Sequence, residues 1–418
     1  MPHDTGFPAD DIRQRFPSLQ QAGSFIFFDN AAGAQIPDIV LSAVTDHLLC
    51  RNVQRGGPYA RSREVDRMIA QARGSVAAFV NATGPDEIAF GLNATSFIRS
   101  ISLAIGQSIR DRSGNRRDRN EVVVSELDHE ANIATWLALE RFGARIVWWR
   151  VRDDGRLYPS DLESIIGERT RIIACAVATN ALGTLVDVGE VARVAHAVGA
   201  EVFLDAVHYA PHAPIDVQQF GCDYMVCSGY KVFAPHMGFV WCRREAVNAL
   251  PTFREHFIPD VTPDKLEAGT YAYENVAGMD AAIGYLASLG DQAASRTHQI
   301  RSGMTRIKEY EQTLSAAMLD VLQGVDNLTV YGVTDRARLG ERVPTFAFSV
   351  DGKSSAAIAE RLGGHDVGVR SGHMYSPRLL DRLGLLPDGV VRASLVHYNT
   401  LDEIARFGAA LGLAIAAA

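Results

Sequence analysis

The chain has 418 residues, of which 47% are hydrophobic and 22% charged, a composition that excludes a disordered or fibrous protein. Its 41 basic and 49 acidic side chains give a formal net charge of −8, which argues against a general binder of nucleic acids or anionic membranes. This length admits one large α/β domain, or two ordinary ones, with an ample core.

Targeting signals are not evident in the sequence. The first residues, MPHDTGFPADD, have no basic segment followed by an apolar one, so no secretory signal is expected. The longest apolar runs, such as residues 172–177, are as long as a strand and too short to cross a bilayer. The chain has five cysteines, an odd number that does not suit a disulfide scaffold. We therefore expect the protein to reside in a reducing cytoplasm.

Short apolar runs alternate with amphipathic stretches from about residue 25 to residue 245. Pro37 can open the first helix, and the face of the second helix repeats apolar side chains at helical spacing from Val65 to Val76. Because the strands are apolar on both faces, they predict a mostly parallel sheet covered by helices on both sides. The predicted strands are 25–29, 87–91, 121–125, 145–150, 171–178, 201–205, 223–228 and 238–242.

The pattern changes after Gly290. A long helix is expected over 292–322, followed by strands at 328–331 and 344–350, a helix at 354–362, and a terminal helix from Thr400. Two further strands are expected to end near Arg370 and Leu395. We predict three parts: a large cofactor-binding domain (25–290), a small α+β domain (291–418), and an N-terminal segment (1–24) that packs with the small domain. The charged stretch 110–120 is expected to be a solvated loop.

An acid and a lysine follow two predicted strands of the same sheet. Asp205 closes one strand, and Lys231 follows a later one, so both are expected at the carboxyl edge, where open α/β sheets bind ligands. This pair suits pyridoxal phosphate (PLP): the lysine amine forms a Schiff base with the cofactor, and the carboxylate keeps the ring nitrogen protonated. The alternative is a strand-end lysine in solvent and an aspartate that caps a helix.

A second feature could hold the phosphate of such a cofactor. Residues 91–96 follow a predicted strand and open the helix 97–109, so Thr95 and Ser96 lie where free backbone amides favour an anion. The same residues are also ordinary helix caps. No glycine-rich dinucleotide or P-loop motif occurs at a strand-to-helix turn.

Two histidines have the position and chemistry to contact the cofactor ring. His129 follows the strand 121–125 and could stack on a flat ring, and His208 lies three residues after Asp205. His208 and His212 also have the spacing of a metal pair on a helix, but Pro211 and Pro214 argue against a helix there, so no metal is expected.

Two arginines late in the chain suit a carboxylate. Arg370 and Arg392 lie at or within strand-like runs, and a guanidinium binds the carboxylate of an amino acid through two parallel hydrogen bonds. Either arginine taken alone fits an exposed surface residue better.

Taken together, these segments resemble the class V aminotransferase family, specifically its cysteine desulfurase-like branch of fold-type I PLP enzymes. The likeness runs through most of the chain and includes FFDNAAGAQIP (27–37), NATS (93–96), ELDHEAN (126–132), TNALGT (179–184), FLDAVHYAPHAPIDV (203–217), CDYMVCSGYKVFAPHMG (222–238), EAGT (267–270) and RASLVHYNTLDEI (392–404). The resemblance implies the α/β fold-type I PLP-dependent transferase fold, with a mostly parallel seven-stranded sheet in the large domain.

The resemblance also implies roles for individual residues. Lys231 would carry PLP, Asp205 would pair with the pyridine nitrogen, and His129 would stack on the ring. His208, at a position where the family usually has glutamine, and Asn180 would lie near the phenolic oxygen. Arg392 would bind the substrate carboxylate, with Arg370 at the same mouth. The phosphate ligands would be Thr95, Ser96, Ser228 and Tyr230. Thr270 would reach the phosphate in the site of the partner subunit, which implies a homodimer with its sites at the interface.

The chain departs from true cysteine desulfurases in one late loop. In those enzymes, a nucleophilic cysteine that takes up sulfur follows shortly after the segment matching residues 370–373. Here Tyr375 stands at about that place, and no cysteine follows Cys242. Neither Met374 nor Tyr375 can accept sulfur as a thiolate does. A persulfide intermediate is therefore not expected.

The remaining chemistry is the removal of the Cα proton from an amino acid bound to PLP as an external aldimine, with Lys231 as the base. We expect β-elimination, of the C–S or C–Se lyase type, because the motifs are most similar to those of desulfurases and selenocysteine lyases. Transamination and epimerisation are the alternatives on the same scaffold. A non-catalytic partner protein is disfavoured, since it would not need to retain Lys231, Asp205 and Arg392 together.

Overall fold

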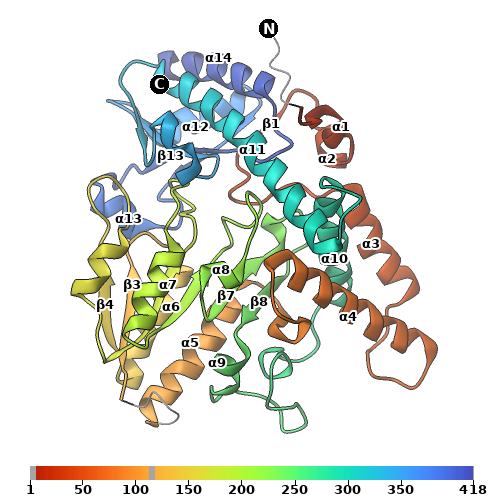
Figure 1. Ribbon diagram of the computed structural model, residues 1–418. Coiled ribbons are helices and arrows are strands. Elements are labelled where there is room, and N and C mark those ends of the chain that lie inside the picture. The colour runs from red at the N-terminus through yellow and green to blue at the C-terminus, as the bar shows by residue number, and fades with distance from the viewer. Residues whose placement is uncertain (1–5, 113–117, 418) are drawn as a thin grey trace.

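A computed structural model describes residues 6–112 and 118–417 of the chain (Figure 1). Its largest sheet has seven strands in the order β2-β8-β7-β6-β5-β3-β4, and only β8 runs antiparallel to its neighbours. This confirms the predicted mostly parallel α/β sheet. The strands are β2 (Ile88–Gly91), β3 (Glu121–Ser125), β4 (Arg145–Trp149), β5 (Thr170–Ala176), β6 (Glu201–Asp205), β7 (Tyr224–Ser228) and β8 (Gly238–Cys242).

Successive side chains of these strands enter two different cores. On β5, Ile172 and Ala174 belong to the core beneath helix α5 (Ala94–Arg110), whereas Ile173 and Cys175 belong to the core on the opposite face. This two-sided burial follows from the two-residue period of a strand and explains why the strands read as continuous apolar runs.

Helices cover both faces of the sheet, as the ribbon shows (Figure 1). The helices of this part of the chain are α3 (Asp38–Cys50), α4 (Ala60–Val80), α5, α6 (Ala131–Leu137), α7 (Val188–Ala197), α8 (Val217–Phe220), α9 (Arg244–Asn248) and α10 (Tyr273–Ser288). Val65, Ile69, Ala72 and Val76 are buried on one face of α4, as the helical spacing predicts.

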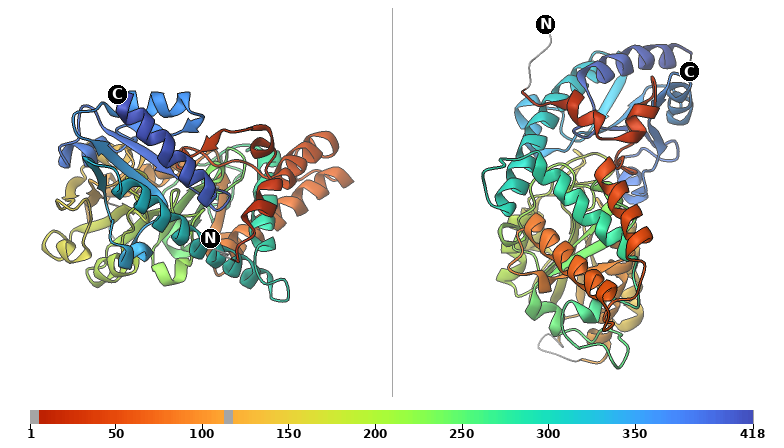
Figure 2. Two further views of the ribbon diagram at one scale, coloured as in Figure 1. Left: turned by 90° about the horizontal axis from the view of Figure 1, so that it is seen from above. Right: turned by 90° about the vertical axis from the view of Figure 1, so that its right-hand side faces the viewer.

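A second, antiparallel sheet has the order β12-β13-β10-β9 and lies beyond the carboxyl end of the large sheet (Figures 1 and 2). It shares a core with the long helix α11 (Arg296–Gln323) and with α12 and α14. The remaining elements here are β9 (Leu328–Tyr331), β10 (Thr345–Val350), α12 (Ser355–Gly364), β11 (Val367–Gly368), β12 (Arg370–Gly372), α13 (Pro377–Arg382), β13 (Val390–Ser394) and α14 (Leu401–Ala417).

The first predicted strand, 25–29, is wrong in both its length and its place. Only β1 (Ile26–Phe27) is a strand, and it pairs in parallel with β11 rather than with the large sheet. The reason is packing: Ile26 and Phe28 bury their side chains in the core of the second sheet. The alternation of apolar residues identified an extended segment, but it could not identify the sheet that the segment joins.

The N-terminal segment that carries helices α1 (Ala9–Gln14) and α2 (Pro17–Gln21) contacts both parts of the chain. The Phe7 ring stacks on Tyr310 of α11 at 4.4 Å, while Phe16 contacts the rings of both Tyr398 and Phe233. The division into domains at residues 24 and 290 therefore stays a prediction. The start of the chain and residues 113–117 of the predicted loop 110–120 lie outside the described residues.

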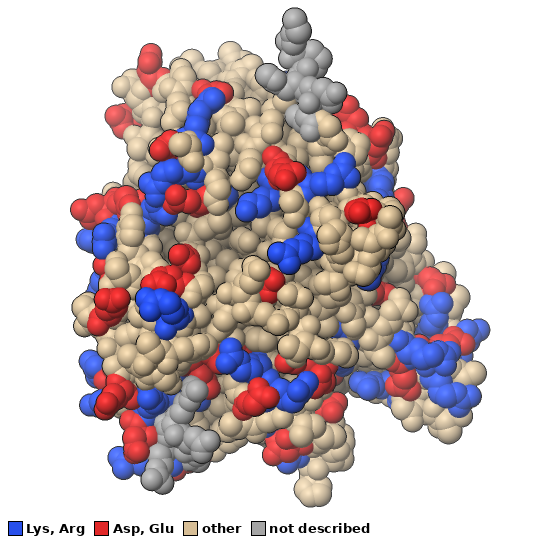
Figure 3. All heavy atoms as spheres, in the orientation of Figure 1, with Lys and Arg blue, Asp and Glu red and all other residues tan. Residues whose placement is uncertain are grey.

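Acidic and basic side chains are interspersed over the face of the molecule shown in Figure 3. No large area of a single sign is visible on that face, which agrees with the argument from net charge against a general nucleic-acid binder. Within residues 6–112 and 118–417, every helix is too short or too polar to cross a bilayer.

Candidate functional site

Asp205 lies at the floor of a pocket at the carboxyl edge of the large sheet. It is the last residue of β6 and is in register with Ala176 of β5 and Val226 of β7. Its Oδ1 accepts a hydrogen bond of 2.9 Å from the backbone N–H of Val207. Burial raises the pKa of Asp205 to about 6, although this backbone hydrogen bond and nearby Lys231 act in the opposite direction.

Lys231 enters the same pocket from the turn after the neighbouring strand. It ends a short 3₁₀ turn (Gly229–Lys231) directly after β7, and its Nζ donates a hydrogen bond to the carbonyl of Ala31. The pKa of Lys231 is lowered to about 8. Burial is the largest cause, the positive charge of Arg392 acts in the same direction, and the negative charge of Asp205 opposes them. An amine with this pKa is partly neutral near pH 7.5, as a nucleophile towards carbonyls requires.

Gly229 makes this placement of the lysine possible. A Cβ atom at this position would lie 2.8 Å from the carbonyl oxygen of Pro235 and 3.1 Å from Met237. The backbone N–H of Gly229 donates to the Met237 carbonyl at 2.8 Å, which closes the loop between β7 and β8. Glycine is required here because the two backbone segments approach so closely.

His129 forms one wall of the pocket. Its Nδ1 accepts a hydrogen bond of 3.0 Å from the backbone N–H of Ala131, so the ring proton is on Nε2. Burial, with smaller contributions from Lys231 and Arg392, lowers the pKa of His129 to about 4. The imidazole is therefore neutral at pH 7 and presents a flat face to a heteroaromatic ring.

His208 lies in the same wall and has an unused hydrogen-bonding atom. Its Nε2 lies 3.0 Å from Oγ1 of Thr345, while its Nδ1 is buried and has no hydrogen-bond partner among the described residues. Burial, with smaller contributions from the neighbouring His212, Lys231 and Arg392, holds the pKa of His208 well below its usual value. A buried polar atom without a partner is costly, so a ligand oxygen at this position would relieve the cost.

The predicted phosphate ligands divide into two groups. Thr95, Ser228 and Tyr230 line the pocket, and the Ser228 hydroxyl accepts a hydrogen bond of 3.1 Å from the first backbone N–H of α5. Ser96 instead pairs with Asn93, the N-cap residue of α5: its hydroxyl donates to the Asn93 carbonyl at 2.7 Å, and its backbone N–H donates to the Asn93 side chain. The structure thus places Ser96 in a capping box, outside the pocket lining.

Arg392 and Arg370 lie close together on β13 and β12, where they are directly opposite each other in the antiparallel pair. The Asp29 carboxylate binds both guanidinium groups. It accepts a bond of 2.7 Å from Nη2 of Arg370 and one of 3.0 Å from Nη2 of Arg392. The cluster lies beside the pocket, because Arg392 also donates a hydrogen bond of 2.9 Å to the backbone carbonyl of Asn180, a residue of the lining.

The loop after β12 carries Tyr375 at the mouth of the pocket. Met374 and Tyr375 both adopt left-handed backbone conformations, with φ of 51° and 59°. Such conformations cost energy for residues other than glycine and are concentrated at functional sites. The Tyr375 ring stacks near His129, with the ring centres 5.5 Å apart and the planes 29° apart, and half of the tyrosine is exposed.

Asn180 holds this loop in place. Its Nδ2 donates to the Met374 carbonyl at 2.6 Å, and its Oδ1 accepts from the Ser376 hydroxyl at 3.0 Å. Its backbone carbonyl also accepts a bond from Nη1 of Arg392. Asn180 lines the pocket. Both groups of its side-chain amide are already bonded to the loop 374–376, so its main contacts orient that loop and Arg392.

Thr270 is an exposed residue and does not line this pocket. Its hydroxyl accepts a hydrogen bond of 2.8 Å from the Gln54 side chain. The predicted role of Thr270, in the site of a second subunit, stays a prediction.

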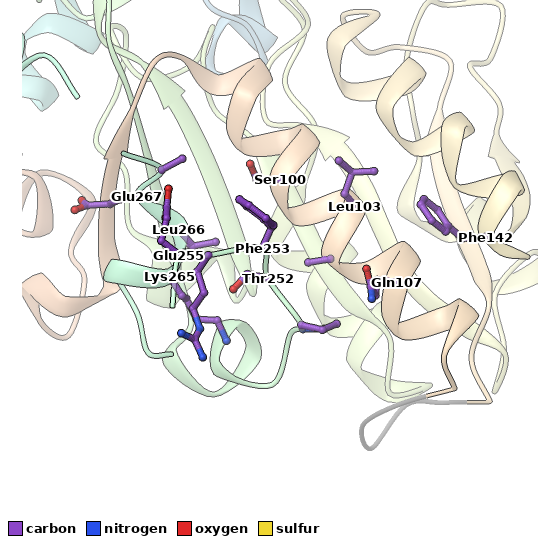
Figure 4. Close-up of a pocket in the computed structure, with 14 residues that line it drawn as sticks. Ser100, Leu103, Gln107, Phe142, Thr252, Phe253, Glu255, Lys265, Leu266 and Glu267 are labelled. Carbon is purple, nitrogen blue, oxygen red and sulfur yellow. The ribbon is translucent and has the colours of Figure 1, made fainter. Parts of the chain in front are cut away.

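A second, more spacious hollow lies below α5, between that helix and the segment 251–268 (Figure 4). Its buried charged groups are already paired: Lys265 donates to the carbonyl of Leu250 at 2.9 Å, and Glu267 binds Arg73 at 2.7 Å. Its lining includes the carboxylate of Glu255 but no histidine or cysteine, so this hollow lacks the convergent amine, carboxylate and imidazoles of the first pocket and is not the candidate for the reaction.

Sequence reasoning missed three features of the site. It assigned no role to Asp29, to the fully buried Asp128 or to the contact between Tyr375 and His129. Burial raises the pKa of Asp128 to about 7, and its carboxylate fixes Asn132 through a bond of 2.7 Å. An acidic residue at the end of a strand-like run, as at Asp29, is the one signal that could have drawn attention to it.

The residues of the pocket fit the PLP cofactor that the sequence implied. Lys231 supplies the amine, Asp205 a carboxylate, His129 a flat wall, and the start of α5 an anion seat. The unpartnered Nδ1 of His208 adds a group that such a ligand would satisfy. The described residues contain no cluster of histidine, cysteine or acidic groups that could hold a metal ion.

Comparisons with known proteins agree with this fit. The family model for aminotransferase class-V matches residues 26–407. A protein of Gibberella zeae named aminotransferase-like protein FGM3 is 34% identical, covering 98% of this chain and 99% of its own. A probable cysteine desulfurase of a Synechocystis species is 30% identical, covering 96% and 94% of the two chains.

Solved structures show the same fold. The apo structure of a cysteine desulfurase from Thermococcus onnurineus superposes with a TM-score of 0.84 at 25% identity, covering 97% of each chain. The match of the family model over most of the chain is decisive: this chain belongs to the class V aminotransferase family and is a PLP-dependent enzyme.

Proposed function

We propose that this enzyme removes the Cα proton of an amino acid and eliminates a sulfur or selenium substituent from Cβ, without a persulfide-forming cysteine. The observation that carries the proposal is a contrast within one site. Lys231 and Asp205 line the pocket and the two arginines lie beside it, while the loop at its mouth offers Tyr375 instead of a thiol.

Each residue has a part in this proposal. PLP, when bound, supplies an electron sink for the charge that develops at Cα. Lys231, through its Nζ, holds the cofactor and then takes the Cα proton, and its lowered pKa suits a base near neutral pH. Asp205 keeps the ring nitrogen protonated, and Arg392 with Arg370 orients the substrate through its carboxylate.

The proposed reaction balances without an added oxidant or reductant. The Cα–H bond breaks, its electron pair forms the Cα=Cβ bond, and the Cβ–S or Cβ–Se bond breaks with its pair on the leaving group. The leaving group takes a proton, and the released aminoacrylate reacts with water to give pyruvate and ammonia. The thiol of a desulfurase is not needed for any of these steps.

Product analysis of the PLP-loaded enzyme tests the proposal. With β-chloro-L-alanine and S-phenyl-L-cysteine, we expect pyruvate and ammonia in equal amounts, and thiophenol from the second compound. If the α-proton of the same amino acids exchanges for deuterium without release of pyruvate, the enzyme is an epimerase. If turnover requires an added keto acid, it is an aminotransferase, the activity that the name of the Gibberella zeae relative suggests.

We also propose that the enzyme acts as a homodimer in the cytoplasm. The exposed position of Thr270 beside Gln54 supports a contact with the phosphate site of a second subunit. The five cysteines, all with free thiols, support a reducing compartment. Light scattering on the purified protein tests the dimer, which a monomeric mass in the presence of PLP would exclude.

A further inference from the structure

We propose that Asp29 determines the substrate class: by neutralising one of the two arginines of the carboxylate site, it restricts the enzyme to amino acids whose side chain carries no second carboxylate. The proposal rests on the proposed role of Arg370 and Arg392 in binding the substrate carboxylate. Asp29 itself would act through these arginines, as a positioning and selecting residue.

The contacts of Asp29 show that it is an internal partner of both arginines. Nε of Arg370 lies 3.1 Å from Oδ2, and Nη2 of the same residue lies 2.7 Å from it. The other oxygen, Oδ1, accepts from Nη2 of Arg392 at 3.0 Å. One carboxylate thus bridges two guanidinium groups, which is the arrangement expected of a bound acid.

The backbone fixes Asp29 in this position. Phe28 accepts a bond of 2.6 Å from the N–H of Ser394, and Asn30 donates one of 3.4 Å to the Ser394 carbonyl, so the segment runs beside the end of β13. Asp29 forms an isolated parallel bridge with Ser394. Since it lies between these anchors, Asp29 is expected to stay beside the arginines when a substrate enters.

Arg392 keeps a free hydrogen-bond donor for that substrate. Its Nη1 donates to the Asn180 carbonyl at 2.9 Å and its Nη2 to Asp29, while Nε is buried and has no partner among the described residues. Only 2% of the Arg392 side chain is exposed. A buried guanidinium with an unused N–H has a place for one more acceptor.

The charge balance of the site then favours a single additional anion. Two arginines and one aspartate leave one positive charge, which the α-carboxylate of an amino acid would neutralise. Lys231 is the only lysine or arginine among the residues that line the pocket. Since Lys231 would hold the cofactor, and His129 and His208 have lowered pKa values and are neutral at pH 7, a second carboxylate would find no unpaired cation among the residues of this lining.

Binding of two amino acids to the PLP-loaded enzyme tests the proposal. L-norvaline and L-glutamate both have unbranched side chains, but only the longer side chain of glutamate carries a second carboxylate. We expect calorimetric titration to show that norvaline binds about tenfold more tightly or better, and that D29N reduces this preference by about tenfold. Neither compound has a β-leaving group, so the result does not depend on whether the enzyme performs β-elimination.

Two further variants serve as controls. D29E keeps the charge and is expected to keep the preference for norvaline. D351N removes one negative charge at an exposed residue beyond the far end of β10 and should leave the preference unchanged. If D29N weakens both ligands equally, Asp29 has only a structural role. If the unaltered enzyme binds glutamate as tightly as norvaline, the proposal is wrong even should D29N fail to fold.

Discussion

The floor and the mouth of the pocket are built in different ways. On the floor, Asp205 ends β6 and Lys231 follows the neighbouring parallel strand β7, and the register of these strands fixes where the two residues lie. The mouth is assembled from the second sheet and from the segment around Asp29, and it includes two residues with left-handed backbone. A floor set by sheet register supports the chemistry shared by the family, whereas a mouth built from loops can change the substrate and the outcome.

Removal of the floor amine is expected to have the largest effect. Lys231→Ala should lower turnover by roughly 10³- to 10⁴-fold, because the proposed base at Cα is lost. It should also abolish the adduct that borohydride fixes between the protein and PLP, which mass spectrometry detects. Lys308→Ala, at an exposed position on α11, is the matched control and should keep both properties. A borohydride adduct that persists in Lys231→Ala would contradict the assignment of the floor.

The acid on the floor can be tested through both activity and pH. Asp205→Asn should still bind PLP but lose roughly 10²- to 10³-fold in turnover, since a fixed charge at the ring nitrogen is removed. A second measurement follows the binding of PLP to the cofactor-free enzyme by absorbance at about 420 nm. Its rate should rise with pH through about 8, because only the neutral amine of Lys231 attacks a carbonyl.

The pH midpoint of PLP loading should shift in opposite directions when two charged neighbours of Lys231 are replaced. The negative charge of Asp205 raises the lysine pKa, so Asp205→Asn should move the midpoint of loading to lower pH. The positive charge of Arg392 lowers it, so Arg392→Gln should move the midpoint to higher pH. Equal midpoints in all three proteins would show that these groups do not act on the amine.

At the mouth, loss of the buried arginine should weaken substrate binding more than it slows the chemistry. Arg392→Gln removes hydrogen bonds to a charged group that are worth about 1.5–3 kcal/mol, or roughly 10- to 100-fold in affinity. We expect a higher KM for amino acids in steady-state assays, with a smaller change in kcat. Arg361→Gln, at an exposed position on α12, is the control that should leave KM unaltered.

The smallest effect is expected at Tyr375. A stacked aromatic pair contributes about 0.5–1.5 kcal/mol, so Tyr375→Ala should raise KM by roughly 2- to 10-fold, while Tyr375→Phe, which keeps the ring, should match the unaltered enzyme. A loss of turnover in Tyr375→Phe as large as that in Lys231→Ala would overturn the contrast between floor and mouth. Such a loss would show that the Tyr375 hydroxyl takes part in the chemistry.

Much of the floor could be predicted from the sequence, because its elements are local. Apolar runs identified seven strands of the large sheet, and the residues that end β6 and follow β7 were expected at the ligand-binding edge for that reason. The segment 25–29 shows the limit of this reasoning: its pattern predicted a longer strand of the same sheet, yet its side chains pack in the other core.

The sequence alone determined the α/β fold, the PLP cofactor and the family, because strand periodicity and ordered motifs are properties of neighbouring residues. Only the tertiary structure decided that Asp29 lies between Arg370 and Arg392, from which it is separated by 341 and 363 residues. It also decided that Ser96 bonds to the N-cap residue Asn93 while Ser228 lines the pocket. Contacts of this kind depend on which segments the two cores bring together, and no local pattern of residues carries that information.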